Sequence, residues 1–145
     1  MEVEYALSRL YKKQSLTILD IGCHHAELLD ILEYHNDKHN FNVVCVEPMK
    51  ESAKIIRQKM KGYKRIDGLV VEAGISANNE KLTFFKGNAS TLFTSSEEHV
   101  QRFPKNFQNV ETRTIQCFSV NNLLKQIDWI DREIDFIKVD VEGKD

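Results

Sequence analysis

The sequence predicts an α/β fold in which helices cover both faces of a largely parallel sheet. Short apolar runs rich in Val, Ile and Leu alternate with amphipathic stretches, as strands alternate with helices in such folds. Two of the runs stop at residues that end strands, Gly22 and Pro48. The length of 145 residues suits one domain with a core of its own.

The first half of the chain follows this alternation closely. The predicted order is a helix at 3–11, a strand at 15–22, a helix around 28–32, a strand at 41–48, a basic helix at 49–61 and a strand at 68–76. Because helices joining parallel strands cross over with a fixed hand, ligands are expected at the carboxyl ends of the strands.

The pattern changes after residue 76. Residues 81–85 and 110–118 predict two strands with no helix between them, and the long polar stretch 87–109 predicts a lid or a disordered loop. Ser119 is predicted to cap a short helix, and 133–143 is the last predicted strand.

Composition excludes several classes of protein. A hydrophobic share of 41% with two Pro and six Gly excludes collagen-like, low-complexity and disordered chains. No apolar run approaches the roughly 20 residues of a membrane span, and acids occupy the N-terminus where a signal peptide is basic. We therefore expect a soluble, cytoplasmic protein with no membrane partner. Cys23, Cys45 and Cys117 form no C-x-x-C pair and are predicted to be reduced core thiols.

The formal net charge of −2 is unevenly distributed. Residues 50–65 carry a charge of +6 and the remainder −8. This segment suggests either a nucleic-acid surface or the solvated face of a helix. The second interpretation is favoured, because basic residues 50, 54, 57 and 61 form one stripe beside an apolar stripe.

The first candidate site combines Asp20-Ile21-Gly22, at the end of one strand, with Glu47-Pro48, at the end of the next. A glycine there lets a ligand approach the backbone, and the acid can accept both hydroxyls of a ribose. The later glycines of G-x-G-x-x-G are absent, so a pyrophosphate is disfavoured and a nucleoside without phosphates, such as S-adenosylmethionine, fits better. An ordinary strand end remains the alternative.

The second candidate site lies in the last strand. Lys138, Asp140 and Glu142 alternate, so their side chains are predicted to share one face, together with Ile134 and Phe136. Charges in a row on a central strand need a partner or a ligand. A Lys138–Asp140 ion pair on an edge strand is the alternative.

Other polar residues are interpreted structurally. Adjacent His24 and His25 point apart in a turn, so no metal site is predicted. His35 and His39 are predicted to be exposed to solvent, and Trp129 to pack beneath the end of a helix.

Five blocks lie in order within residues 16–143: ILDIGCHHAELL, VVCVEP, VVEAGIS with KLTFF, TIQCFSVNNLL and IDFIKVDVEG. Together they resemble the FkbM-type family of S-adenosylmethionine-dependent methyltransferases. That family typically begins D-x-G-A-N-x-G, which Asp20 and Gly22 match, whereas His24 replaces the usual Asn and Ala26 the usual Gly. Its E-P and K-x-D-x-E-G motifs correspond to Glu47-Pro48 and to residues 138–143.

The resemblance implies S-adenosyl-L-methionine as the cofactor, with Glu47 at the ribose and Gly74-Ile75-Ser76 near the adenine. The implied cofactor-binding residues are Asp20, Gly22, Cys23, His24, Glu47, Pro48, Gly74 and Ile75, and the implied catalytic residues are Lys138, Asp140 and Glu142. It implies O-methylation of a sugar or another small hydroxylated metabolite. Asp140 or Glu142 is the candidate general base, and Lys138 is placed to orient the acceptor.

Two other functions remain open: a nucleoside-binding module without transfer, and a nucleic-acid methyltransferase that docks its substrate on residues 50–65. Sheets of this class usually have seven strands, so we expect a Rossmann-like sheet that stops after its fourth core strand. The edge at 134–142 would then be covered by the segment 82–118, by a second copy in a homodimer, or by further strands of a longer protein. The third alternative is favoured, and it predicts that this chain is the cofactor half of that protein and methylates poorly by itself.

Overall fold

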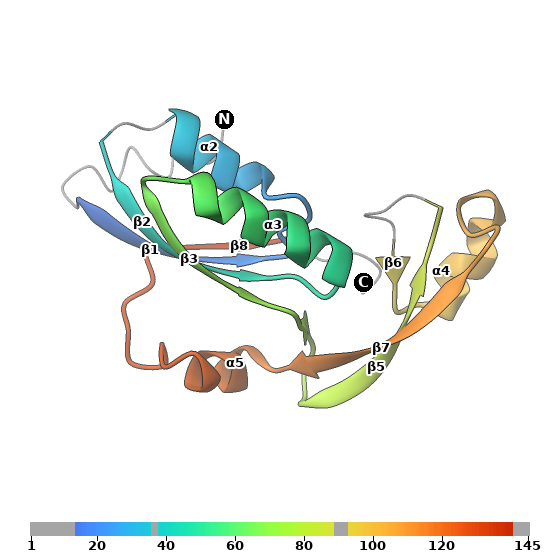
Figure 1. The fold of residues 1–145 in the computed structure, drawn as a ribbon. Helices are drawn as coiled ribbons and strands as arrows, with labels where there is room; N and C mark the ends of the chain where they lie inside the picture. Colours follow the sequence, from blue (N-terminus) through green and yellow to red (C-terminus); the bar gives the residue numbers. More distant parts are fainter. Residues whose placement is uncertain (1–13, 36–37, 89–92, 141–145) are drawn as a thin grey trace.

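The computed structural model describes residues 14–35, 38–88 and 93–140 (Figure 1). The elements are β1 (Ser15–Ile21), α2 (Glu27–His35), β2 (Asn40–Val46), α3 (Lys50–Gly62), β3 (Ile66–Val71), β4 (Gly74–Ile75), β5 (Glu80–Lys86), β6 (Phe93–Thr94), α4 (Glu97–Arg102), the 3₁₀ turn η1 (Pro104–Asn106), β7 (Glu111–Phe118), α5 (Val120–Gln126) and β8 (Phe136–Val139). The predicted helix at 3–11 lies outside the described residues.

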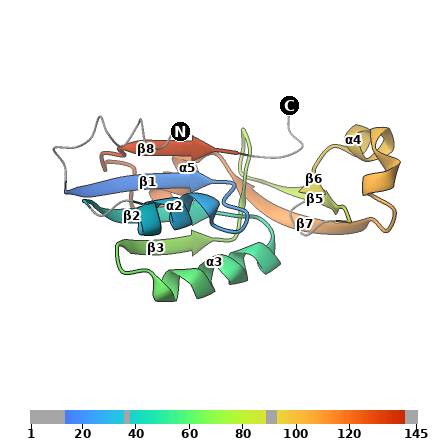
Figure 2. The same cartoon turned by 90° about the horizontal axis from the view of Figure 1, so that it is seen from above.

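Four parallel strands form the first sheet, in the order β3-β2-β1-β8. Helices α2 and α3 lie on one face of this sheet and α5 on the other (Figures 1 and 2). The predicted α/β class with helices on both faces is therefore confirmed, and the sheet is compatible with a Rossmann-like methyltransferase. Within the described residues β8 has one neighbouring strand, and its Ile137 and Val139 are 50% and 62% exposed.

Alternation along β1 explains the two cores. Leu16 and Ile18 are buried with the apolar side chains of α2 and α3, and Leu19 and Ile21 with those of α5. Strands β1 and β2 have almost continuous burial because helices cover both of their faces. Trp129 belongs to the α5 core, as predicted.

The second sheet, β4-β7-β5-β6, is thinner and mostly antiparallel. Its own core consists of Met49, Phe84 and Cys117, with Leu82 and Ile115 packed beside them. The strands predicted at 81–85 and 110–118 are confirmed, and all three cysteines are buried and free. The expectation that no helix separates these strands is wrong, because α4 begins after Ser96, whose hydroxyl accepts the amide of His99.

Three further predictions are wrong. Residues 68–76 are not one strand, because β3 ends at Val71 and Gly74–Ile75 joins the second sheet. Ile134 precedes β8 and packs in the α5 core, whereas Phe136 packs in the other core, so the two do not share a face. His39 is 5% exposed, with its ring near that of Phe41.

Within the described residues, no helix is both long and apolar enough to cross a membrane.

Candidate functional site

Backbone hydrogen bonds align the carboxyl ends of the four parallel strands. The amide of Asp140 donates to Ile21 (2.9 Å), that of Gly22 to Val46 (2.9 Å) and that of Glu47 to Val71 (3.0 Å). These three bonds cross from strand to strand at one edge of the sheet. The sequence motifs from β1, β2 and β8 therefore meet there, as expected for this class of fold.

Gly22 makes the turn after β1 possible. Its φ is +81°, in the left-handed region, and a Cβ at this position would lie 1.7 Å from the carbonyl oxygen of Asp140. No L side chain fits that space, so glycine is required by both conformation and contact. The backbone of β8 consequently lies directly against the turn.

Two residues that follow Gly22 also have positive φ, His24 at +51° and Ala26 at +68°. These are the positions where the family typically has Asn and Gly, the residues that adopt this conformation most readily. The 22–26 loop therefore has left-handed backbone conformations at His24 and Ala26, although the side chains at these two positions disfavour them. Hydrogen bonds from Ala26 N–H to Cys23 (2.8 Å) and from Asp30 N–H to Ala26 (3.0 Å) lead it into α2.

Glu47 lies completely buried beside this loop. One carboxylate oxygen accepts the amide of His24 (2.9 Å) and the other accepts the amide of Met49 (2.9 Å). Burial raises the pKa of Glu47, and the two amide hydrogen bonds oppose that shift. The Glu47 carboxylate therefore joins the 22–26 loop to the start of α3 and is part of the packing at the strand end.

Asp20 is also fully buried, and Lys138 is its partner. The Lys138 ammonium lies 3.1 Å from an Asp20 oxygen and donates to the carbonyl of Gly22 at 2.8 Å. Burial raises the pKa of Asp20, and the Lys138 charge opposes the rise. The ion pair of Lys138 thus runs across to β1, where register places Asp20 opposite it, instead of along β8 to Asp140.

Asp140 is the exposed member of the group. Its carboxylate is 56% exposed and lies 3.5 Å from Nε2 of His24, whose side chain is 13% exposed. Nδ1 of His24 is buried and has no hydrogen-bond partner among the described residues. Asp140 can therefore face a ligand, while Glu142, the third predicted charged residue, lies outside the described residues.

Two cysteines lie beside Asp20. The Sγ atoms of Cys23 and Cys45 and a carboxylate oxygen of Asp20 lie within 4.8 Å of one another, although the two cysteines are far apart in sequence. This trio is a poor cation site, because it offers three fully buried donors and an ammonium already neutralises Asp20. Burial raises the pKa of the Cys23 thiol, which keeps it protonated.

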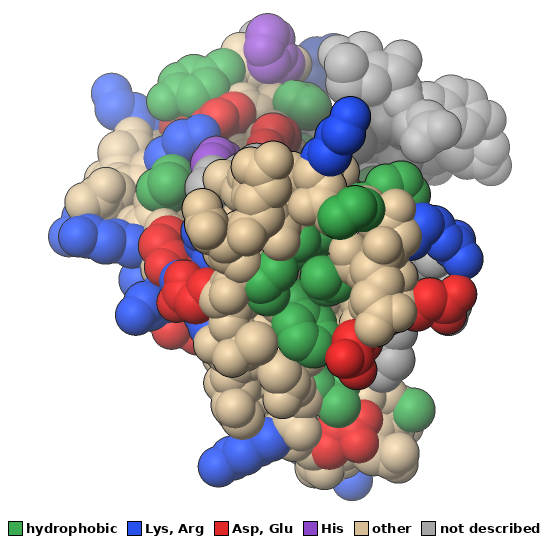
Figure 3. All heavy atoms as spheres, turned by 90° about the vertical axis from the view of Figure 1, so that its right-hand side faces the viewer, with side chains coloured by type: hydrophobic (Ala, Val, Ile, Leu, Met, Phe, Trp, Pro, Cys, Tyr) green, Lys and Arg blue, Asp and Glu red, His purple; other side chains and the backbone are tan. Residues whose placement is uncertain are grey.

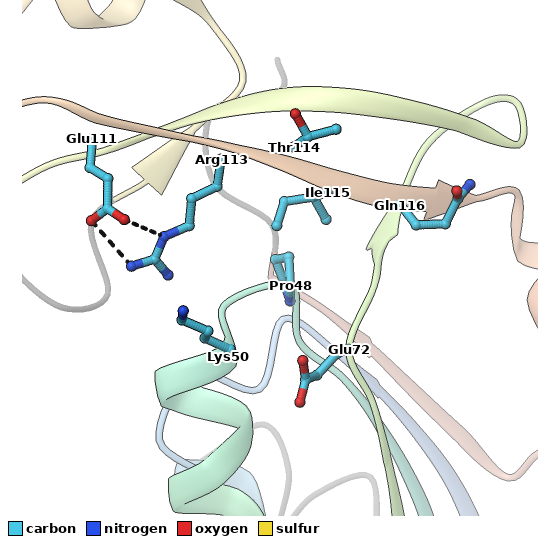
Figure 4. A pocket seen from close by; sticks show the side chains of 8 residues that line it. All are labelled: Pro48, Lys50, Glu72, Glu111, Arg113, Thr114, Ile115 and Gln116. Atoms are coloured by element: carbon cyan, nitrogen blue, oxygen red, sulfur yellow. Dashed lines mark hydrogen bonds and ion pairs between the residues drawn. The ribbon is translucent and has the colours of Figure 1, made fainter.

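A pocket of about 420 Å³ opens next to the E-P motif (Figure 4). It is lined by Pro48, Lys50, Glu72, Glu111, Arg113, Thr114, Ile115 and Gln116. The Arg113 guanidinium bonds both oxygens of Glu51 at 2.6 Å and also bonds Glu111, and this pairing lowers the pKa of Glu51 to about 2. Pro48 is the one lining residue that the sequence analysis predicted for the site. Thr114, Ile115 and Gln116 of β7 belong to the block TIQCFSVNNLL, which was given no role in binding.

The predicted adenine residues lie in the second sheet. Gly74 has the sulfur of Cys117 2.7 Å from where its Cβ would be, and Ile75 packs against the α5 core. The structure thus brings Asp20, the 22–26 loop, Glu47, Lys138 and Asp140 together at the strand ends. Gly74–Ile75 belongs to β4, which pairs with Cys117 and Phe118 of β7, the two residues that follow Gln116 of the pocket.

A glycine turn and two buried acids lie at the carboxyl ends of adjacent parallel strands, which is where α/β proteins of this architecture bind their ligands. The chain matches the family described as the methyltransferase FkbM domain over residues 20–145. It belongs to that family and is, on this ground, a methyltransferase. Neither a curated protein nor a solved structure matches it.

Proposed function

We propose that this protein uses S-adenosyl-L-methionine to methylate a hydroxyl group of a sugar or another small metabolite. The observation that carries the proposal is the meeting of the Gly22 turn and the buried Glu47 carboxylate at adjacent strand ends. The loop between them lacks the glycines that bind a pyrophosphate. A cofactor that offers a ribose and no phosphate matches these features.

The chain's own groups suit the parts of such a cofactor. Gly22 leaves room for the backbone of Asp140, which brings the end of β8 against the turn. Each Glu47 oxygen keeps a lone pair beyond its amide bond, which a ribose hydroxyl can use once the groups that cover this buried carboxylate move aside. The pocket beside Pro48 has an apolar surface from Pro48 and Ile115 and the amide of Gln116 at its wall, which suits a planar base. Gly74 and Ile75 would support that end through β7.

When bound, the cofactor supplies an activated methyl group, which leaves sulfur as it bonds to the acceptor oxygen. Positioning by the protein can account for about 7–11 kcal/mol of such a barrier. The acceptor hydroxyl also loses a proton, and the exposed carboxylate of Asp140 is placed to take it. Lys138, held by Asp20 and Gly22, is 24% exposed and can direct its remaining N–H bond to the acceptor.

The basic stripe of α3 gives less support to a nucleic-acid substrate. Arg57 is paired with Glu72 at 2.5 Å, and Lys50 lines the pocket. On the face shown in Figure 3, the Lys and Arg side chains are separated and interspersed with acidic ones. We therefore keep the small-molecule acceptor as the proposal.

The proposal includes a cytoplasmic location, which the three free cysteines favour.

Thermal shift with S-adenosylmethionine, its demethylated product, NAD and ATP tests the cofactor. Ligand at about 100 times its dissociation constant stabilises the fold by about 2.7 kcal/mol, which raises the Tm by a few degrees. A shift with NAD alone contradicts the proposal. Release of the demethylated product in the presence of a sugar panel then tests transfer. Asp140→Asn should lower kcat more than cofactor affinity, and a cofactor-binding chain without transfer on any acceptor would leave only a binding module.

A further inference from the structure

The unusual backbone of the 22–26 loop has a partner outside the strand ends. Lys59, in the last turns of α3, donates to the carbonyl oxygen of His25 at 2.7 Å and to Asp30 of α2 at 2.8 Å. The other oxygen of Asp30 accepts the hydroxyl of Tyr63. The two helices lie side by side on the same face of the sheet (Figures 1 and 2).

The position of this contact is informative. The carbonyl of His25 belongs to the peptide that joins it to Ala26, and the orientation of that peptide plane sets the φ of Ala26. A left-handed φ is unfavourable for alanine because of its Cβ. Ala26 is completely buried in the core that β1 forms with α2 and α3. A disfavoured conformation persists only when its surroundings hold it. A charged donor on that carbonyl oxygen is such a restraint.

We propose that Lys59 is a positioning residue for the cofactor, which acts by fixing the His25–Ala26 peptide. The Lys59 ammonium, on α3, stabilises a left-handed φ at Ala26, a conformation that a glycine at position 26 would adopt without such a contact. This inference rests on the proposed function for its effect on cofactor binding. It also removes Lys59 from the basic residues available to an external anion, since its charge is paired with Asp30.

The test is a cycle of Lys59→Met and Ala26→Gly, because methionine keeps the aliphatic stem and removes the ammonium. Calorimetry with the demethylated cofactor product should show about tenfold weaker binding for Lys59→Met, equivalent to ~1.4 kcal/mol. In the Ala26→Gly background the same change should weaken binding less than threefold, since glycine adopts positive φ without steric strain. A merely structural lysine would give the same loss in both backgrounds.

The matched control is Lys61→Met, two positions along α3 at an exposed site, which should leave affinity unchanged. Amide hydrogen exchange in the ligand-free chain gives a second readout. The Ala26 amide, bonded to Cys23, should exchange about tenfold faster in Lys59→Met than in Lys61→Met.

Equal exchange in these two variants would overturn the inference, as would equal losses of affinity in both backgrounds. Absence of cofactor binding by the unmodified chain would instead count against the proposed function. The exchange comparison then still decides the role of Lys59.

Discussion

The two sheets differ in what holds them. In the parallel sheet, β1 and β2 are buried along nearly their whole length, and the site's carboxylates, Asp20 and Glu47, are buried with them. The second sheet has half-exposed strands, a small core and an Arg113–Glu51 ion pair that connects β7 to the start of α3. Changes at the strand ends should therefore affect folding and site together, whereas changes at the second sheet should be milder and sensitive to salt.

The largest effect is expected from Gly22→Ala. The added methyl group would overlap the carbonyl of Asp140 and force a disfavoured φ, so the free energy of unfolding should fall by about 3 kcal/mol or more. Urea denaturation measures it. Gly62→Ala is the control, because a methyl group added there, at the end of α3, would have nothing within 4 Å, and it should change stability by less than about 1 kcal/mol.

Lys138→Met should cost about 3 kcal/mol at pH 8, because it leaves the buried Asp20 carboxylate without its counter-ion. Burial already raises the pKa of Asp20 above 3.8, and loss of the lysine raises it further. Between the ordinary pKa of 3.8 and the raised folded-state pKa of Asp20, the folded protein keeps a proton that the unfolded chain has released. The free energy of unfolding of this variant therefore falls as pH rises through that interval. Urea midpoints at pH 5 and pH 8 should show the larger loss at pH 8; equal losses would contradict the pairing.

Glu47→Ala should lower the free energy of unfolding by about 2 kcal/mol, because the amides of His24 and Met49 lose their acceptor. Glu47→Gln retains one oxygen and should lose about half as much. Denaturation together with calorimetric cofactor affinity measures both effects. If Glu47→Ala kept full stability and lost only affinity, the carboxylate would be a ligand group with no part in the packing.

The smallest effect is expected at the second sheet, where Glu51→Gln should cost about 1 kcal/mol because the pair is partly exposed. The pKa of Glu51 is lowered to about 2, so its contribution is present above pH 4.5 and is lost as pH falls toward 2. Denaturation at low and high NaCl should show the difference shrinking with salt. A salt-independent loss would mean that packing, and not charge, joins the sheets.

The buried strands and their ends could be predicted because local pattern determines them. Residues of β1 and β2 are apolar on both faces, and Gly22 and Pro48 mark where they stop. Helix α4 gave no such pattern, since none of its residues is buried and Ser96 is its main sequence signal. The burial of Glu47 was not predictable for a different reason: its partners are backbone N–H groups, which every residue except proline has, so no side chain in the sequence marks them.

The pairing of Lys138 shows a further limit. Period-two spacing places Lys138 near Asp140 on the same strand, but the ion pair depends on which strand lies next to β8. That neighbour is β1, and its register sets Asp20 opposite Lys138. The 22–26 loop was located from its sequence, whereas its left-handed residues and its contact with Lys59 required the packing of α3 beside α2.

The contact between Lys138 and the Gly22 turn spans 116 positions of the chain. A ribosome synthesises the buried acid of β1 long before it synthesises the cation that neutralises it. Until β8 pairs with β1, Asp20 must stay hydrated or protonated. The carboxyl ends of the strands, where the site lies, therefore cannot pack as they do in the folded protein. Assembly of the site is thus expected as a late event of folding, coupled to the release of nearly the whole described chain from the exit tunnel.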